Sequence, residues 1–252
     1  MSIKETRILM GMPATIEIVD FFASKADLEK VFSYFKYVEE KFSPFRSDSE
    51  LSAINRGQIK ESDWSQDMKI IFELSEKTKK ETNGYFDIVA NNGKYNPSGL
   101  VKGWAIYNGA LILKNLGFKN FYVEIAGDIQ VFGKNSDGQA WKIGIKNPFS
   151  QKEIVKAVYL KDQGIATSGT YIRGQHIYNP QNRNEKITDI VSLTVIGPNI
   201  YEADRFATSA FAMGRQGINF IENLSGFEAY MIDKNKIATM TGNFNKYLNE
   251  DN

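Results

Sequence analysis

Strand-like segments crowd into the second half of this 252-residue chain, and helix-like segments lie before and after them. Short runs rich in β-branched and aromatic residues, separated by turn signals, predict strands. Apolar residues at helical spacing, ended by Asn-Gly or Gly, predict helices. Because the two kinds of segment are largely segregated along the chain, we expect an α+β or mixed α/β protein.

The expected elements cover most of the sequence. The expected strands are residues 14–19, 121–125, 129–132, 141–145, 154–160, 192–196 and 229–232. The expected helices are residues 25–40, 64–82, 102–116, 202–212 and 218–224. A Ser-x-x-Glu capping box at residues 47–50 predicts one more short helix, through Ile54. No linker separates independent domains, so we expect one domain over residues 1–252, or two intimate subdomains.

Composition excludes several classes of protein. The 31 basic and 30 acidic residues balance, which argues against a nucleic-acid partner or an anionic membrane surface. Cysteine is absent, which excludes disulfides, Cys-type zinc sites and thiol nucleophiles. The sequence has no apolar run long enough for a membrane span and no signal-peptide core. We therefore expect a cytoplasmic chain, or a periplasmic one if an export signal has been removed.

A carboxylate and a hydroxyl stand four residues apart in the expected 202–212 helix. Asp204 and Thr208 fall on one helical face, one turn apart. Small neighbours (Ala203, Ala207 and Ala210) let another backbone come close. Two oxygen ligands on one face suit a hard divalent cation such as Mg²⁺. The same pair also fits an Asp near a helix N-terminus and a Thr bonded to its own helix.

The segment 96–105 is a glycine-bearing loop that leads into an expected helix. Such a loop presents backbone N–H groups and a positive helix end to an anion, and Lys102 would add a point charge for phosphate. The segment lacks both the Walker and the dinucleotide glycine spacing, so it is neither motif. It also fits an ordinary helix entry with a solvated lysine.

Three further segments carry small or polar residues. Gly127-Asp128 within a strand pattern predicts a bulge, or a close approach of backbone to a ligand. Residues 164–171 place three hydroxyls around Gly169 and fit either a phosphate site or a polar turn. His176 is the only histidine, and it is a candidate general base near neutral pH or a structural hydrogen-bonding residue.

Together these segments resemble the ApbE family, the FAD:protein FMN transferases. The segments that carry the resemblance, in the family's order, are Met10-Gly11, residues 42–55, residues 83–87, residues 98–103, Gly127-Asp128, Thr167-Ser168-Gly169, residues 176–180 and residues 203–208. Eight segments in register make chance agreement a poor explanation. The resemblance implies an ApbE-like (T-fold-like) single domain, with helices packed on antiparallel-rich sheets.

The resemblance also implies which residues form the site. Mg²⁺ would be held by Asp204, Thr208 and the backbone carbonyl of Gly99. The implied catalytic residues are His176, Asp204 and Lys102, with His176 as the base for an acceptor hydroxyl. The residues implied to bind the cofactor are Met10, Phe45, Tyr85, Phe86, Asp87, Asn96, Lys102, Gly127, Asp128, Thr167, Ser168, Gly169, His176 and Ile177.

The activity implied by the resemblance is transfer of FMN from FAD onto a Ser or Thr hydroxyl of a partner flavoprotein, with release of AMP. The acceptor would carry a segment like Asp-Gly-x-Ser/Thr-x-Ala-Thr, which this chain lacks, so it should be another protein. The alternatives are an FAD pyrophosphatase, giving FMN and AMP, and a non-catalytic FAD-binding protein. The sequence departs from the family pattern at Phe45, Asn96 and Ala126, where Tyr, Asp and Gly are usual.

Overall fold

The computed structural model describes residues 2–90, 92–170, 177–183 and 186–250. Its main sheet has eight strands in the order β1-β2-β3-β4-β7-β8-β9-β10, and every neighbouring pair is antiparallel. Strands β5 and β6 form a separate antiparallel hairpin. The strands are β1 (Ile3–Leu9), β2 (Met12–Ile18), β3 (Phe121–Ile125), β4 (Asp128–Phe132), β5 (Trp141–Asn147), β6 (Ser150–Leu160), β7 (Gly164–Gly169), β8 (Ile190–Gly197), β9 (Glu228–Asp233) and β10 (Ala238–Met240).

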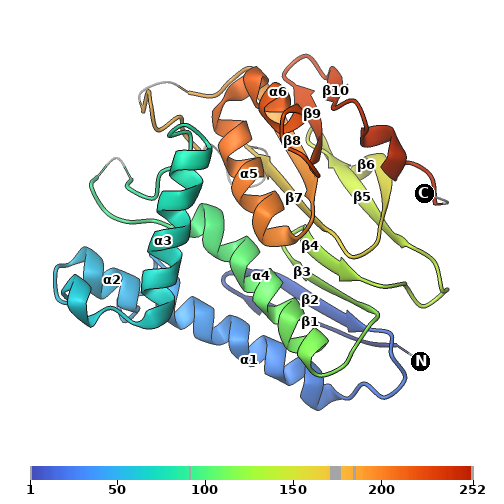
Figure 1. Ribbon diagram of the computed structural model, residues 1–252, viewed down its shortest axis with the longest axis horizontal. Coiled ribbons are helices and arrows are strands. Elements are labelled where there is room, and N and C mark those ends of the chain that lie inside the picture. Colours follow the sequence, from blue (N-terminus) through green and yellow to red (C-terminus); the bar gives the residue numbers. More distant parts are fainter. Residues whose placement is uncertain (1, 91, 171–176, 184–185, 251–252) are drawn as a thin grey trace.

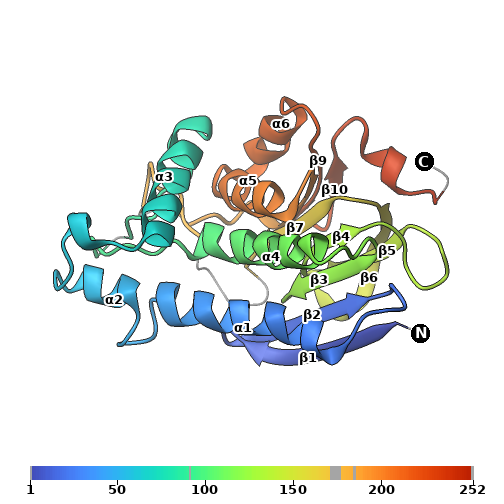
Figure 2. The ribbon, with the colours of Figure 1, turned by 60° about the horizontal axis from the view of Figure 1, so that its bottom comes forward.

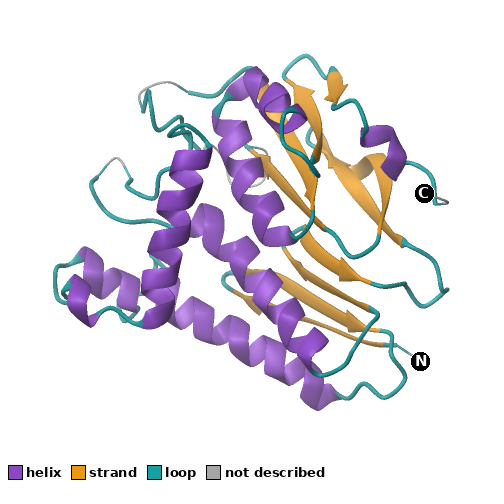
Figure 3. Cartoon of the chain, in the orientation of Figure 1, coloured by secondary structure: helices purple, strands orange, loops and turns teal. Residues whose placement is uncertain are grey.

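The helices are α1 (Lys25–Phe42), α2 (Glu50–Asn55), α3 (Gln66–Glu81), α4 (Ser98–Asn115), α5 (Ile200–Ala212) and α6 (Gly217–Glu222). Figures 1 and 2 show α1, α4 and α5 along one face of the main sheet, and α2 and α3 to one side of it, where they pack on α1 and α4. Short 3-10 helices occur at Glu61–Asp63, Gly214–Gln216 and Phe244–Tyr247. Figure 3 shows the resulting separation of helices from strands, which confirms the expected mixed α and β fold.

The central strands of the main sheet are buried on both faces, and a hydrophobic core lies on each side of them. Neighbouring residues of a strand point to opposite faces. Ala166 and Met231 belong to the core shared with the helices, whereas Ile165 and Ile232 belong to the core shared with the β5–β6 hairpin. The hairpin therefore covers the face of the sheet that the helices leave, and Trp141 is among the hairpin residues in that second core.

Three strands were not predicted from the sequence. β1 and β10 are edge strands, each paired on one side only. β7 lies between β4 and β8. It falls in the segment 164–171, for which the sequence suggested a phosphate site or a polar turn. Its glycines and hydroxyls give no apolar alternation, so only pairing with its neighbours makes it a strand.

Two predicted helix starts were wrong. α4 begins at Ser98, four residues earlier than expected, so Lys102 lies within the helix and not in a loop before it. The capping box predicted at residues 47–50 is not formed. The N-cap of α2 is Ser49, whose hydroxyl accepts the backbone N–H of Ser52. Glu50 instead accepts hydrogen bonds from Ser65, the N-cap of α3.

Among the described residues, no helix is long and apolar enough to cross a membrane.

Candidate active site

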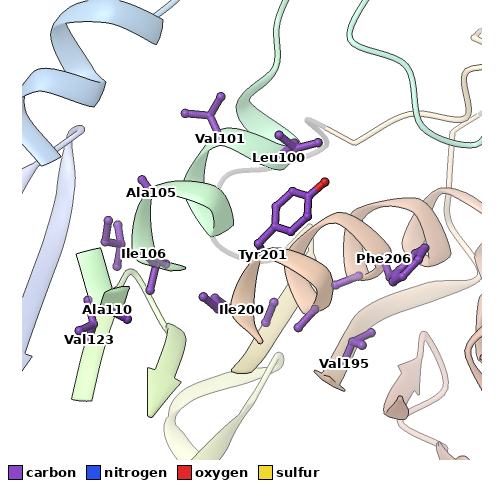
Figure 4. Packing of buried hydrophobic residues seen from close by; sticks show 14 of the residues in the cluster. Leu100, Val101, Ala105, Ile106, Ala110, Val123, Val195, Ile200, Tyr201 and Phe206 are labelled. Atoms are coloured by element: carbon purple, nitrogen blue, oxygen red, sulfur yellow. The ribbon is translucent and has the colours of Figure 1, made fainter. Parts of the chain in front are cut away.

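Helices α4 and α5 pack against each other more closely than ordinary side chains allow. Figure 4 shows apolar side chains of both helices in one cluster, among them Leu100 from α4 and Tyr201 from α5. At the polar end of this contact, a Cβ added at Gly103 would lie 2.6 Å from the Cβ of Asp204. A Cβ added at Gly99 would lie 3.0 Å from the Thr208 methyl carbon. The glycines of α4 therefore allow the Asp204 face of α5 to approach its backbone.

The side chains of Asp204 and Thr208 bond to α4 and not to their own helix. The Gly103 backbone N–H donates to Asp204 Oδ2 at 2.8 Å. The Thr208 hydroxyl donates to the Gly99 carbonyl at 3.3 Å. The alternative of intrahelical bonds for this pair is therefore wrong. The structure brings together Gly99, Asp204 and Thr208, the three residues whose oxygens were predicted to share a cation.

A lysine joins two buried carboxylates at this point. Lys102 Nζ forms an ion pair with Asp128 and lies 3.4 Å from Asp204 Oδ1. Asp128 and Asp204 are only 2% and 3% exposed, so each needs a compensating partner. The other oxygen of Asp128, Oδ1, accepts the Thr167 backbone N–H at 3.0 Å. One cationic group thus ties α4 to β4 and α5.

Asp128 owes its position to a tight turn and not to the bulge that the sequence predicted. Ala126 and Gly127 are the only residues between β3 and β4, and Ile125 pairs directly with Asp128. Both turn residues have positive φ, 53° at Ala126 and 93° at Gly127, as in two-residue hairpin turns that favour glycine. Ala126, where the family usually has glycine, adopts a backbone conformation that is unfavourable for an alanine.

A pocket of about 400 Å³ opens beside this cluster. Of the residues predicted for the site, those that line it are Phe45, Tyr85, Phe86, Asp87, Asn96, Gly99, Lys102, Thr167, Ser168, Gly169, Ile177, Asp204 and Thr208. Residues from α4, α5, β7 and three connecting segments thus converge on one cavity.

Three predicted residues lie outside the lining of this pocket, and one lies outside the described residues. Met10 does not line it, and its backbone N–H donates to Glu39 Oε2 at 3.0 Å. Gly127 and Asp128 do not line it either, although Asp128 contacts Lys102, which does. His176 falls outside the described residues, so its role stays a prediction.

Several residues that line the pocket were not among the predicted site residues. They are Ala90, Ser98, Ala126, Tyr178, Pro180 and Ala212. Tyr178 follows the predicted His176-Ile177 pair directly, and burial raises the pKa of its phenol. Its hydroxyl donates to the Val89 carbonyl at 3.1 Å, which fixes one side of the pocket.

Two cations lie around the carboxylate of Asp87 in the pocket wall. Lys79 Nζ lies 2.9 Å and Arg183 Nη2 lies 3.5 Å from Asp87 Oδ2. The Val89 backbone N–H donates to the other oxygen of Asp87 at 2.9 Å. Asp87 therefore acts at least partly as a structural anchor that joins the end of α3 to the loop that contains Arg183.

The donor atoms of this site fit Mg²⁺. Among the described residues, no three carboxylate, imidazole or thiol side chains gather at one point. A cation here would therefore draw on one carboxylate, a hydroxyl and a backbone carbonyl, which Asp204, Thr208 and Gly99 present together. Mg²⁺ is commonly held by one or two carboxylates, with waters and substrate phosphates as its remaining ligands.

Comparison with known proteins agrees with this architecture. The model of the ApbE family matches residues 10–94 and 89–231, which include the α4–α5 cluster and the pocket wall. The chain belongs to the ApbE family.

An FAD:protein FMN transferase of Vibrio cholerae is 34% identical over 128 residues, 47% of this chain and 38% of that protein. The corresponding protein of Salmonella typhimurium is 29% identical over 142 residues, 53% of this chain and 41% of that protein. The match thus spans about two fifths of these curated relatives.

Solved structures of ApbE proteins share the whole fold. The flavin transferase ApbE of Vibrio cholerae aligns with a TM-score of 0.85 at 22% identity, over 98% of this chain and 99% of that one. An ApbE protein of Thermotoga maritima aligns with a TM-score of 0.88 at 18% identity, over 99% and 100%. The predicted ApbE-like fold is therefore confirmed.

Proposed function

We propose that this ApbE-family chain transfers FMN from FAD onto a Ser or Thr hydroxyl of a partner flavoprotein, using Mg²⁺ and releasing AMP. The observation that carries the proposal is the convergence of Gly99, Asp204, Thr208 and Lys102 at the edge of a pocket walled by aromatic rings. The names of the relatives, FAD:protein FMN transferases, supply the reaction class.

The pocket suits a ligand with both a flat ring system and phosphates. Tyr85, Phe86 and Phe45 offer aromatic surface, and Phe45 is 92% exposed, so its ring is available to a ligand. Aromatic faces stack on heteroaromatic rings. Ser98 and Lys102, which also line the pocket, offer the N-terminal end of α4 and an ammonium group, both of which favour a phosphate anion.

The proposed reaction forms one P–O bond and breaks another. The acceptor hydroxyl oxygen bonds to the phosphorus of the FMN half, and the bond from that phosphorus to the bridging pyrophosphate oxygen breaks. That oxygen leaves with AMP, and the hydroxyl proton passes to a base, for which His176 remains our candidate. Lys102, whose Nζ lies 3.4 Å from Asp204 Oδ1 in the pocket wall, would stabilise the negative charge on the phosphates.

Asp204, Thr208 and the Gly99 carbonyl would hold Mg²⁺. When bound, the cation supplies charge neutralisation at the pyrophosphate. The chain's own contribution is to hold these donors in place. Gly103 anchors the Asp204 carboxylate through its N–H, and the small residues of α4 keep the two helices in register.

Incubation with FAD, MgCl₂ and a peptide carrying Asp-Gly-x-Ser/Thr-x-Ala-Thr tests the proposal. Intact mass spectrometry should show the peptide gaining one FMN through a phosphoester, with one AMP released per transfer. Free FMN and AMP with an unmodified peptide would instead identify an FAD pyrophosphatase. Tight FAD binding without turnover would identify a carrier, and either result would overturn the transferase proposal.

A further inference from the structure

A second cavity of about 470 Å³ lies on the hairpin side of the sheet. One wall is the face of the main sheet, with residues from β1, β2, β3, β4 and β7 and the turn between β3 and β4, and the other wall is β5 with part of the loop before it. All six consecutive residues from 141 to 146 line it, from both faces of β5, and none of the described residues of β6 does. The cavity is therefore a groove along one edge of β5, and we call it the β5 groove.

That edge of β5 has no partner strand among the described residues. β5 pairs with β6 alone, in a sheet of two strands. An edge strand presents unpaired backbone N–H and C=O groups, which can add a further strand from another chain. Extended peptides bind many proteins in this way, through backbone bonds and pockets for alternate side chains.

The β5 groove adjoins the candidate active site. Ala126 and Thr167 line both cavities, and Asp128, which lines the groove, pairs with Lys102, which lines the active-site pocket. The ladder between β4 and β7 includes only the pairs of Ile129 and Gln130, so it stops before Asp128. Beyond that point the Asp128 carboxylate replaces the ladder by accepting the Thr167 N–H. The backbone hydrogen bonds between β4 and β7 therefore end where the two cavities meet.

The groove is lined by three lysines (Lys4, Lys142 and Lys146) and three carboxylates (Glu17, Glu124 and Asp128), and two of the lysines stand on β5. Its carboxylates already have partners: Glu17 pairs with Lys4 at 3.0 Å, and Glu124 accepts the Tyr122 hydroxyl at 2.5 Å. Lys142 and Lys146 are exposed on β5 and form no ion pair within the described part of the chain. Lys142 Nζ lies over the ring of Tyr159 on β6, 5.8 Å from its centroid, so the two ammonium groups stand on the solvent side of β5, beside the groove.

We propose that the β5 groove docks the acceptor protein, as an extended segment that adds to the free edge of β5 and places its aspartate beside Lys142 or Lys146. The segment would present its hydroxyl to the active-site pocket across the rim that Ala126 and Thr167 share. This inference rests on the proposed transferase activity, because it assigns the surface that selects the acceptor. It assigns Lys142 and Lys146 to acceptor specificity and not to FAD binding.

Hydrogen exchange tests the docking without depending on turnover. The probe is a synthetic peptide, Asp-Gly-Ala-Ser-Gly-Ala-Thr, added at saturating concentration to the full chain. The backbone amides of β5 on its free edge should exchange at least about tenfold more slowly with the peptide than without it. Unchanged exchange across residues 141–147 overturns the inference, whatever the rate of FMN transfer.

A charge reversal tests the two lysines. The double variant Lys142→Glu with Lys146→Glu should raise the KM for the peptide about tenfold or more, at an unchanged kcat and an unchanged affinity for FAD. The matched control is Lys152→Glu with Lys161→Glu, which makes the same charge change on exposed residues of the same hairpin region outside the groove. Equal KM values for the two double variants would overturn the assignment of Lys142 and Lys146.

The two proposals fail in different ways. Protection of β5 amides without FMN transfer would retain the docking site and overturn the transferase activity. Transfer of FMN without protection of β5 would retain the activity and overturn the docking site.

Discussion

Thr208 illustrates how one hydroxyl serves both packing and chemistry. Its hydroxyl bonds the Gly99 carbonyl across the α4–α5 contact, and it also lines the pocket. A threonine inside a helix more commonly bonds a carbonyl of its own helix, as Thr78 and Thr82 do in and just after α3. The difference marks Thr208 as a residue whose oxygen is directed at a neighbouring element.

Substitutions at Thr208 separate shape from chemistry. Thr208→Val keeps the shape and removes the hydroxyl, so FMN transfer should fall about 10- to 100-fold and require more Mg²⁺ for half-maximal rate. Thr208→Ser keeps the oxygen and should stay within about threefold of the parent. Steady-state rates over a Mg²⁺ titration measure both. Equal rates for Val and Ser would show that the hydroxyl does not serve the reaction.

Gly103→Ala tests the close approach of the two helices. An alanine in a helix is normally favoured over glycine by about 1 kcal/mol. Here its Cβ would lie 2.6 Å from the Asp204 Cβ, so overpacking should instead lower the free energy of unfolding by about 1–3 kcal/mol. Urea unfolding followed by circular dichroism measures the change. A stabilised variant would contradict the observed packing.

The position of α5 depends on more than its contact with α4. Arg205, 3% exposed, points away from the pocket toward α3. Its guanidinium pairs with Glu81 at the end of α3 and with Glu202 on its own helix. Because the chain continues from α3 into Tyr85 and Phe86, this ion pair also holds the aromatic wall of the pocket relative to Asp204.

Arg205→Ala should therefore destabilise the fold. The loss should be about 2–4 kcal/mol, below that for a fully buried pair because Glu81 is 38% exposed. Lys36→Ala is the control, since Lys36 and its partner Glu40 are 69% and 47% exposed and their pair should contribute at most about 1 kcal/mol. Chemical denaturation of both variants gives the comparison. Similar losses in the two variants would show that Arg205 has no special structural role.

Across the whole molecule, the two-sided burial of the sheet makes stability sensitive to alkaline pH. Burial, with the charge of Glu124 adding to it, raises the pKa of Tyr122 well above its usual value. The unfolded chain ionises this phenol near pH 10 while the folded chain keeps it protonated. The stabilisation is therefore complete below about pH 10 and is lost as the pH rises above it.

Tyr122→Phe should flatten that alkaline loss. Because the variant lacks the phenol, the loss of unfolding free energy with rising pH should be smaller by up to about 1.4 kcal/mol per pH unit above about pH 10. Urea titrations from about pH 8 to about pH 11.5 would show this, because that range brackets the ordinary pKa of a tyrosine phenol. Parallel curves for the parent and the variant would contradict the raised pKa.

Much of the fold could be predicted from local patterns, because most helices and strands carry their own periodicity. β7 could not, since the segment Gly164–Gly169 is a strand only through β4 and β8. The start of α4 was also missed, because Ser98 and Gly99 read as loop residues and only packing against α5 makes them helical.

In the candidate site, too, some contacts could be predicted from the sequence and others depend on tertiary packing. The spacing of Asp204 and Thr208 predicted their common face, and the family resemblance predicted Gly99 as their partner. The ion pair of Lys102 with Asp128 could not be predicted, because it joins residues 26 positions apart on different elements. The β5 groove was missed for the same reason, since it exists only where a hairpin passes over the sheet.

The most direct test of the proposed activity compares the parent chain with Asp204→Asn in one assay. Each is incubated with FAD, MgCl₂ and the acceptor peptide, and intact mass and AMP are measured over time. The parent should add one FMN to the peptide with one AMP released, excess EDTA should stop the reaction, and Asp204→Asn should be slower by about 10²-fold or more. Equal transfer by the parent and Asp204→Asn, or transfer that persists in EDTA, would contradict the proposed site.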